Sequence, residues 1–217
     1  MIEIAIDGTA ASGKGTLGKK LSDKYSFPYL DTGMLYRKVA HDLIKNNKVN
    51  TTGLEKTSCD FATILNLKEL KNTNLRTEDV SKLSSKIATF PSLRKILNKK
   101  QKEFNNSNKK KFGGCILDGR DIGTTILPNA DFKFFITASL EVRAKRRLLE
   151  KNISFLHEND EKCMLQTLIN DMYIRDRLDS TRSNAPLVPA KGAHLIDTST
   201  INAEELLEMV SKIIEGN

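Results

Sequence analysis

A glycine-rich loop near the start of the chain constrains the fold more than any other feature of the sequence. The loop, GTAASGKGT, follows the apolar run IEIAI and precedes Leu17, Leu21 and Tyr25, which recur at a spacing of four. This spacing places the three side chains on one face of a helix. In a strand-loop-helix unit of this kind, backbone N–H groups and the helix N-terminus surround a phosphate group. A glycine-rich turn that binds no ligand is the alternative.

The residues of this loop predict a site for a nucleoside triphosphate and Mg²⁺. Glycine lets the backbone approach a polyanion without a Cβ clash. We expect Lys14 to reach the transferring phosphoryl group and the Thr16 hydroxyl to be a ligand of Mg²⁺, while Gly15 stands between them. The residues expected to bind the donor are Gly8, Thr9, Ala10, Ala11, Ser12, Gly13, Lys14, Gly15 and Thr16.

The rest of the chain alternates between strand-like runs and helical patterns. After the first apolar run, further strand-like runs lie at 28–31, 115–118, 132–137 and 194–198. This alternation favours a parallel sheet covered by helices on both faces. We therefore predict an α/β fold with a five-stranded parallel sheet in three α/β/α layers.

One region, from about Asn50 to Ser107, departs from this rhythm. It is helical in pattern, polar and rich in lysine, with no convincing strand before Cys115. We expect an insertion that covers the ligand-binding edge of the sheet. We predict a single domain, 1–217. Its core lies at about 1–50 and 108–217, with an insertion at about 51–107 and a lid at about 150–170.

Size and composition fit one folded, soluble domain. The chain has 217 residues, and its 39% hydrophobic content is enough to bury a core. No apolar run is long enough to cross a membrane, and a strand that begins at Ile2 leaves no room for a signal peptide, so we expect a cytoplasmic protein without a membrane partner. Three cysteines without a CxxC pair predict neither disulfides nor a thiolate metal site.

The net charge of +8 fits an anionic partner, which could be a nucleic acid or a phosphorylated small molecule. The most basic stretch, at 98–111, contains only Phe104 as an aromatic residue for base stacking. A solvated helix end is the favoured interpretation of this stretch. We therefore expect no nucleic-acid partner.

Two motifs follow predicted strands at the edge where open α/β sheets bind ligands. DTGMLYR begins at Asp31, and LDGRD contains Asp118 and Arg120. Asp118 can orient Mg²⁺ through water, and Arg120 can make a bidentate contact with a phosphate. Considered in isolation, either motif could instead be simple turn chemistry.

Charged residues at helical spacing form a third group. Arg175, Asp179 and Arg182 are separated by four and three residues, so all three can face one side of a helix. Arginines directed at a phosphoryl-transfer site would neutralise the charge that develops there, whereas a surface ladder of ion pairs is the alternative. The same choice applies to the arginines of LEVRAKRRLLE, which are Arg143, Arg146 and Arg147. We predict that Arg143 and Arg147 flank the donor nucleotide.

The motifs GTAASGKGT, DTGMLYR, SSKIATFPSLR, LDGRDIGT and RDRLDSTRSNAPLVPA together resemble those of the bacterial-type cytidylate kinase family, a group of P-loop nucleoside monophosphate kinases. The resemblance covers nearly the whole chain. It implies a monomeric enzyme of pyrimidine metabolism that uses Mg²⁺ and ATP to phosphorylate CMP or dCMP, giving CDP or dCDP and ADP. It also implies catalytic roles for Lys14, Asp118, Arg120 and Arg175.

The same resemblance implies roles for the acceptor-binding residues. Those expected at the acceptor phosphate are Thr32, Arg37 and Arg120, with Asp31 and Tyr36 beside them. Those expected at the cytosine edge are Ser85, Arg94 and Asp121. Asp179 and Arg182 are expected at the ribose, and Arg175 near the transferring phosphoryl group.

The base-reading set is chemically suited to cytosine. Cytosine presents an amino donor beside two acceptors, so an Asp or Ser acceptor next to an Arg donor matches it, whereas uracil would face the wrong partner. The nearest alternative is a kinase of the same fold for UMP, AMP or a non-nucleotide acceptor. A P-loop switch or GTP-binding module is less favoured because the chain has no NKxD-type sequence.

The chain differs from the family pattern in one region. Between TILNLKELKNTN and LRTEDV it lacks about a dozen residues that such kinases use for a small β-hairpin. We therefore expect a shortened and mostly helical NMP-binding insertion.

Overall fold

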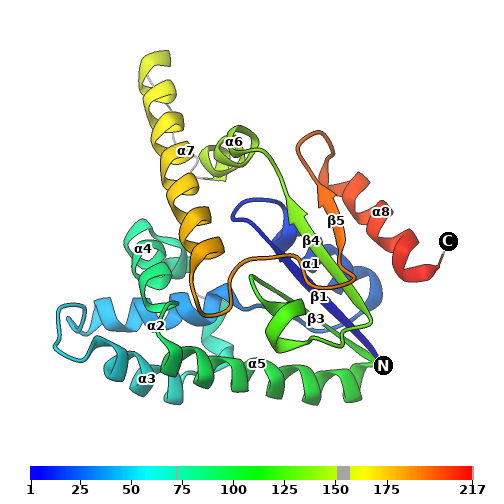
Figure 1. The fold of residues 1–217 in the computed structure, drawn as a ribbon, viewed down its shortest axis with the longest axis horizontal. Coiled ribbons are helices and arrows are strands. Elements are labelled where there is room, and N and C mark those ends of the chain that lie inside the picture. The colour runs from blue at the N-terminus through cyan, green and yellow to red at the C-terminus, as the bar shows by residue number, and fades with distance from the viewer. Residues whose placement is uncertain (72, 151–156, 217) are drawn as a thin grey trace.

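The computed structural model describes residues 1–71, 73–150 and 157–216 of the chain. Within these residues a parallel sheet has five strands in the order β2-β3-β1-β4-β5, which confirms the predicted sheet (Figure 1). The strands are β1 (Ile2–Gly8), β2 (Tyr29–Asp31), β3 (Gly114–Gly119), β4 (Phe132–Thr137) and β5 (His194–Asp197). The central strand, β1, runs directly into the glycine-rich loop.

Helices cover both faces of the sheet, as the sequence predicted. One face packs against α1 (Lys14–Tyr25) and α8 (Ala203–Glu215), and the other against α2 (Gly33–Lys45) and α5 (Pro91–Phe112). A capping box of Asn202 and Glu205 begins α8. Beyond the sheet, α6 (Leu140–Glu150) packs against α7 (Glu158–Thr181), which projects away from the other layers (Figure 1).

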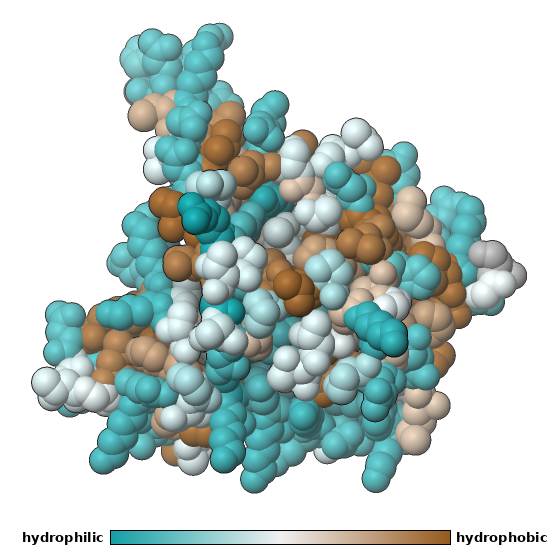
Figure 2. All heavy atoms as spheres, in the orientation of Figure 1, coloured by the Kyte–Doolittle hydropathy of each residue, from teal (hydrophilic) through white to brown (hydrophobic). Residues whose placement is uncertain are grey.

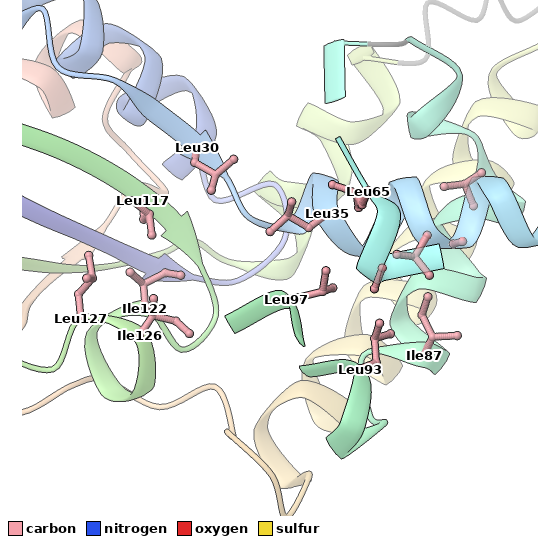
Figure 3. Close-up of a cluster of buried hydrophobic side chains, with 14 of the residues drawn as sticks. Leu30, Leu35, Leu65, Ile87, Leu93, Leu97, Leu117, Ile122, Ile126 and Leu127 are labelled. Carbon is pink, nitrogen blue, oxygen red and sulfur yellow. The ribbon is translucent and has the colours of Figure 1, made fainter. Parts of the chain in front are cut away.

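The alternation of side chains along β1 explains why its sequence is apolar almost throughout. Ile4 and Ile6 belong to the hydrophobic cluster that contains α1 and α8, whereas Ala5 belongs to the cluster that contains α2 and α5. Successive side chains of a strand point to opposite faces, and both faces are buried here. Figure 3 shows the second cluster, in which Leu117 of β3 and Leu97 of α5 are fully buried.

The described chain between β2 and β3 contains helices and no strand, as expected of a mostly helical insertion. After α2 it forms α3 (Leu54–Ile64), the 3₁₀ segments η1 (Leu67–Lys71) and η2 (Thr73–Arg76), α4 (Glu78–Ile87) and α5. The predicted domain boundary at 107 lies inside α5, and the predicted lid boundary at 170 lies inside α7. The predicted lid also includes residues 151–156, which lie outside the described residues. The division into core, insertion and lid therefore stays a prediction.

The described helices all lack the combination of length and apolar character that crossing a membrane requires. Hydrophilic side chains gather along α5 (Figure 2), and the basic stretch at 98–111 forms its C-terminal half. In that half Lys99, Lys102, Lys110 and Lys111 are exposed, which agrees with a solvated helix face.

We expect Leu97→Ala to lower the free energy of unfolding by about 2–5 kcal/mol, because Leu97 is fully buried and its truncation leaves a cavity. Leu149→Ala is the matched control. Leu149 lies in α6 and is 76% exposed, so this substitution should change the free energy of unfolding by no more than about 0.5 kcal/mol. Denaturant unfolding of both variants measures the difference. Equal losses in the two variants would contradict the assigned core.

Candidate active site

A cleft of about 1470 Å³ lies beside the glycine-rich loop and the ends of β2 and β3. Pockets for one small ligand usually have about 300–1,000 Å³, so this cleft has room for two. The predicted site residues that line it are Ala10, Ala11, Ser12, Gly13, Lys14, Gly15, Thr16, Asp31, Thr32, Tyr36, Arg37, Ser85, Arg94, Asp118, Arg120, Asp121, Arg147, Arg175, Asp179 and Arg182. Gly8, Thr9 and Arg143 do not line it.

The glycine-rich loop lies tightly against the sheet. A Cβ on Gly8 would lie 1.9 Å from the carbonyl oxygen of Ile136, so only glycine allows β1 to leave the sheet at this point. At the far end of the loop, Lys14 begins α1 and its Nζ donates to the Thr9 carbonyl at 3.3 Å. Burial, followed by the nearby Arg120, lowers the pKa of Lys14 to about 8. A phosphate beside Lys14 would stabilise its charged form.

Two polar side chains from other parts of the chain donate hydrogen bonds to the backbone of this loop. Thr198 Oγ1 donates to the Ser12 carbonyl at 2.9 Å, and Arg143 Nη1 donates to the Ala10 carbonyl at 3.3 Å. Arg143 is 3% exposed and also pairs with Asp176 at 2.6 Å. In this structure Arg143 therefore contacts the backbone of the donor loop, and its predicted contact with the donor nucleotide stays a prediction.

Asp118 is a buried carboxylate at the end of β3. Its Oδ2 accepts a hydrogen bond from the Tyr29 hydroxyl at 2.7 Å, and burial, with a contribution from Asp31, raises its pKa to about 7. The described residues contain no cluster of three metal-ligating side chains. Mg²⁺ usually keeps several waters and takes one or two carboxylates plus the phosphates of the substrate. Asp118 and the Thr16 hydroxyl fit that donor set.

Arginines from three parts of the chain crowd the middle of the cleft. Arg120 Nε donates to Asp179 at 2.9 Å, and Arg37 Nη1 donates to Ser81 Oγ at 2.6 Å. Burial, followed by the charges of neighbouring arginines, lowers the pKa values of Arg37 and Arg175 to about 10. A bound phosphate would relieve this repulsion, because it adds negative charge where the cations are crowded.

The spacing predicted for Arg175, Asp179 and Arg182 is observed at the end of α7. All three line the cleft, and the side chains of Asp179 and Arg182 are 14% and 9% exposed. Asp179 also pairs with Arg120, which follows β3. The group therefore faces the cleft and does not form a ladder of ion pairs on the surface.

A buried ion pair lies at another part of the cleft. Arg94 Nη2 donates to Asp121 Oδ2 at 2.6 Å, and the two side chains are 4% and 9% exposed. The guanidinium of Arg94 lies over the ring of Tyr36, 5.7 Å from its centroid. Arg94 Nε and the Tyr36 hydroxyl are buried without a hydrogen-bond partner among the described residues. Buried polar groups are normally paired, so these two atoms have unused hydrogen-bonding capacity beside the cleft.

A family model described as cytidylate kinase matches residues 4–216. The chain belongs to the cytidylate kinase family. A cytidylate kinase from Bartonella bacilliformis is 42% identical over 212 residues, which cover 98% of this chain and 94% of that protein. A cytidylate kinase from Acidiphilium cryptum is 40% identical over 217 residues, which cover 98% of this chain and 97% of that protein.

Similarity to solved structures supports the fold of this cytidylate kinase family member. A protein from Eubacterium ventriosum matches with a TM-score of 0.51 and 16% identity, and the match covers 100% of both chains. At this identity the match supports the fold alone. The family assignment rests on the sequence matches, and it confirms the resemblance inferred from the motifs.

The cleft of this cytidylate kinase family member also contains residues that the sequence-based site left out. Tyr29, Arg76 and Arg146 are among them. A signal for Tyr29 was available, because a residue two positions before Asp31 shares its face of the strand. Arg146 belongs to the arginine series at 143–147, but spacing alone did not show which members face the cleft. Arg76 ends a short 3₁₀ segment and has no periodic pattern that indicates its direction.

We expect Gly18→Ala to destabilise the protein even though alanine favours helices. In a helix interior the exchange alone should stabilise by about 0.5–1 kcal/mol. Here the added Cβ would lie 2.4 Å from Cε2 of Tyr29, and overpacking of this kind costs about 1–3 kcal/mol. Denaturant unfolding should show a net loss, whereas Asp23→Ala on the exposed side of α1 should show none. A gain in stability for Gly18→Ala would contradict the tight contact with Tyr29.

Proposed function

We propose that this chain transfers the γ-phosphoryl group of ATP to CMP or dCMP, giving ADP and CDP or dCDP. The observation that carries the proposal is the buried Arg94–Asp121 pair at 2.6 Å in the same cleft as the glycine-rich loop. The loop accounts for a triphosphate donor, and the pair accounts for a cytosine acceptor. The full-length similarity to cytidylate kinases supports the same substrates.

The acceptor base is recognised by complementary donors and acceptors. Asp121 accepts from the amino group of cytosine, and Arg94 donates to the ring nitrogen and carbonyl, with the Ser85 hydroxyl beside them. The unpartnered Arg94 Nε supports this role, because it has a proton to donate. Uracil would place a carbonyl against the Asp121 carboxylate, which leaves two acceptors unpaired.

The acceptor phosphate and ribose bind between this base site and the donor loop. Arg37 and Arg120 hold the phosphate, with Asp31 nearby. The Thr32 hydroxyl turns to the phosphate from the Asp118 carbonyl, to which it donates at 2.7 Å in the structure. Asp179 and Arg182 contact the ribose. Arg37 and Arg175 have no carboxylate at ion-pair distance among the described residues, which supports their binding of an anionic ligand.

The donor ATP binds with its phosphates along the loop and with Mg²⁺ held by the Thr16 hydroxyl and, through water, by Asp118. Mg²⁺ neutralises charge on the phosphates when it is bound. Lys14 turns from the Thr9 carbonyl to the transferring phosphoryl group, and Arg147, which lines the cleft, contacts the donor. Arg143 supports the donor through the loop backbone.

No protein nucleophile is needed for this transfer, because an oxygen of the acceptor phosphate is already anionic. Catalysis rests on in-line positioning and on cations that stabilise the charge of the transferring group. Lys14, Arg120 and Arg175 supply these cations. Exclusion of water from the closed site would suppress ATP hydrolysis. We propose that the enzyme acts as a monomer in the cytoplasm, in pyrimidine nucleotide metabolism.

A panel of acceptors, assayed with ATP and Mg²⁺ by coupled detection of ADP, tests the function. We expect CMP and dCMP to be phosphorylated with kcat/KM values at least about 10²-fold above those of UMP and AMP. Lys14→Ala should lower kcat by about 10²-fold or more while its thermal unfolding stays cooperative. Higher activity with UMP or AMP than with CMP would refute the assigned acceptor.

We expect Asp121→Asn to change acceptor preference more than overall catalysis. The amide is nearly isosteric but can place a donor where cytosine also has a donor, so kcat/KM for CMP should fall by about 10²-fold or more. The value for UMP should fall less, because the new amide can donate to the uracil carbonyl. Steady-state kinetics with both acceptors measures the ratio. An equal loss with both would show that Asp121 does not read the base.

A further inference from the structure

Asp7 is a buried carboxylate that the functions above do not use. It lies near the end of β1, directly before Gly8, and is 3% exposed. Its two oxygens accept hydrogen bonds from the backbone N–H groups of Ile122 at 2.8 Å and Gly123 at 2.7 Å. These two residues begin η3 (Ile122–Ile126), a short π-helical turn. Asp7 therefore joins the strand that enters the donor loop to the turn that follows Asp121.

One of the two hydrogen bonds made by Asp7, the one from Gly123, is a bond that Asp121 would ordinarily compete for. Asp121 occupies the N-cap position of η3, where aspartate is favoured because its side chain can accept from the N–H group of the second or third helical residue, here Gly123 or Thr124. Its side chain makes no such capping bond. The Asp121 carboxylate instead accepts from Arg94 at 2.6 Å.

We propose that Asp7 is a positioning residue for acceptor specificity: it caps the turn at Ile122 and Gly123 and thereby leaves the Asp121 carboxylate free to pair with Arg94 and to face the acceptor base. The inference rests on the proposed function, because it concerns how the cytosine-reading pair is held. Asp7 itself does not line the cleft.

Electrostatics works in the same direction as the hydrogen bonds. Burial raises the pKa of Asp7 to about 6, while the two backbone N–H groups oppose this rise. At a pH well above this pKa, Asp7 is ionised and both its carboxylate oxygens can accept hydrogen bonds. The negative charge of Asp121 also raises the pKa of Asp7, so the two carboxylates repel each other. This repulsion disfavours a rotation of Asp121 back toward the turn.

Asp7→Asn tests the proposal, because the amide preserves size but has only one acceptor oxygen. With an N–H group of the turn released, Asp121 gains a competing partner. We expect KM for CMP to rise at least about ten-fold and the CMP-to-UMP ratio of kcat/KM to fall by a similar factor, while KM for ATP changes by less than about two-fold. The assays are run at a pH well above the pKa of Asp7.

Asp131→Asn is the matched control. Asp131 also accepts a hydrogen bond from the backbone of β1, at 2.8 Å from the Glu3 nitrogen, but at the opposite end of the strand from the cleft. This exchange should leave the CMP-to-UMP ratio unchanged. Suppose that the wild-type protein phosphorylates CMP and that Asp7→Asn, like Asp131→Asn, leaves the CMP-to-UMP ratio unchanged. The inference is then wrong and the proposed function stands. A wild-type protein that does not phosphorylate CMP would overturn both.

A double-mutant cycle separates positioning from a general structural role. If Asp7 acts through Asp121, adding Asp7→Asn to Asp121→Asn should change the CMP-to-UMP ratio by less than about two-fold. Additive effects on this ratio would overturn the proposal, because they would show that Asp7 acts independently of Asp121.

A measurement on the unmodified protein keeps the proposal testable if Asp7→Asn does not fold. The amide protons of Ile122 and Gly123 should exchange slowly with deuterium in the absence of ligand, because both are bonded to the Asp7 carboxylate. Asp7→Glu retains the charge but shifts the carboxylate by one methylene. In this variant the two amide protons should exchange faster, and the CMP-to-UMP ratio of kcat/KM should be lower. Fast exchange of both protons in the wild type would contradict the proposed cap.

Discussion

Pairing of arginines with carboxylates in a partly buried cleft sets the arrangement of the candidate site. Removing a charge from water costs several kcal/mol, so a buried arginine needs an anion at close range. Asp179 holds Arg120 at 2.9 Å, and Asp121 holds Arg94 at 2.6 Å, so these two guanidinium groups are oriented before any ligand binds. Arg175 lacks such a partner among the described residues, and its pKa is lowered to about 10. The cleft therefore has an excess of positive charge near Arg175, and a phosphate would offset it.

Features encoded by short stretches of sequence could be predicted well. The glycine-rich loop and the five strands depend on neighbours within a few positions, and the structure has all of them. The direction of Arg175 and Asp179 toward one side of α7 follows from helical spacing in the same way. The family was recognisable because these local features occur in one order along the chain.

Features that depend on packing between distant segments could not be predicted. Arg143 and Arg147 lie one turn apart on α6, yet Arg143 donates to the backbone of the donor loop and Arg147 lines the cleft. The difference arises from how α6 packs against α7 and the loop, and sequence spacing carries no information about that contact. The hydrogen bond from Tyr29 to Asp118 joins residues 89 positions apart, and neighbouring strands bring them together.

The register between the central strands fixes the position of the glycine-rich loop relative to the loop that follows β3. β1 pairs with β3 so that Asp7 lies beside Gly119, and the two strands then lead into the loops that contain Lys14 and Arg120. Hydrogen bonds of the ladder and the Asp7 cap fix these loops to the same rigid layer. By contrast, Arg94 comes from α5 and Arg182 from the end of α7, outside the sheet. The sheet therefore fixes where the segments that contain Lys14, Arg120 and Asp121 begin, whereas Arg94 and Arg182 reach the cleft from helices around it. We infer that substitutions in α5 can alter acceptor choice without moving Lys14 relative to Arg120, whereas substitutions at the end of α7 also affect Arg120 through its pairing with Asp179.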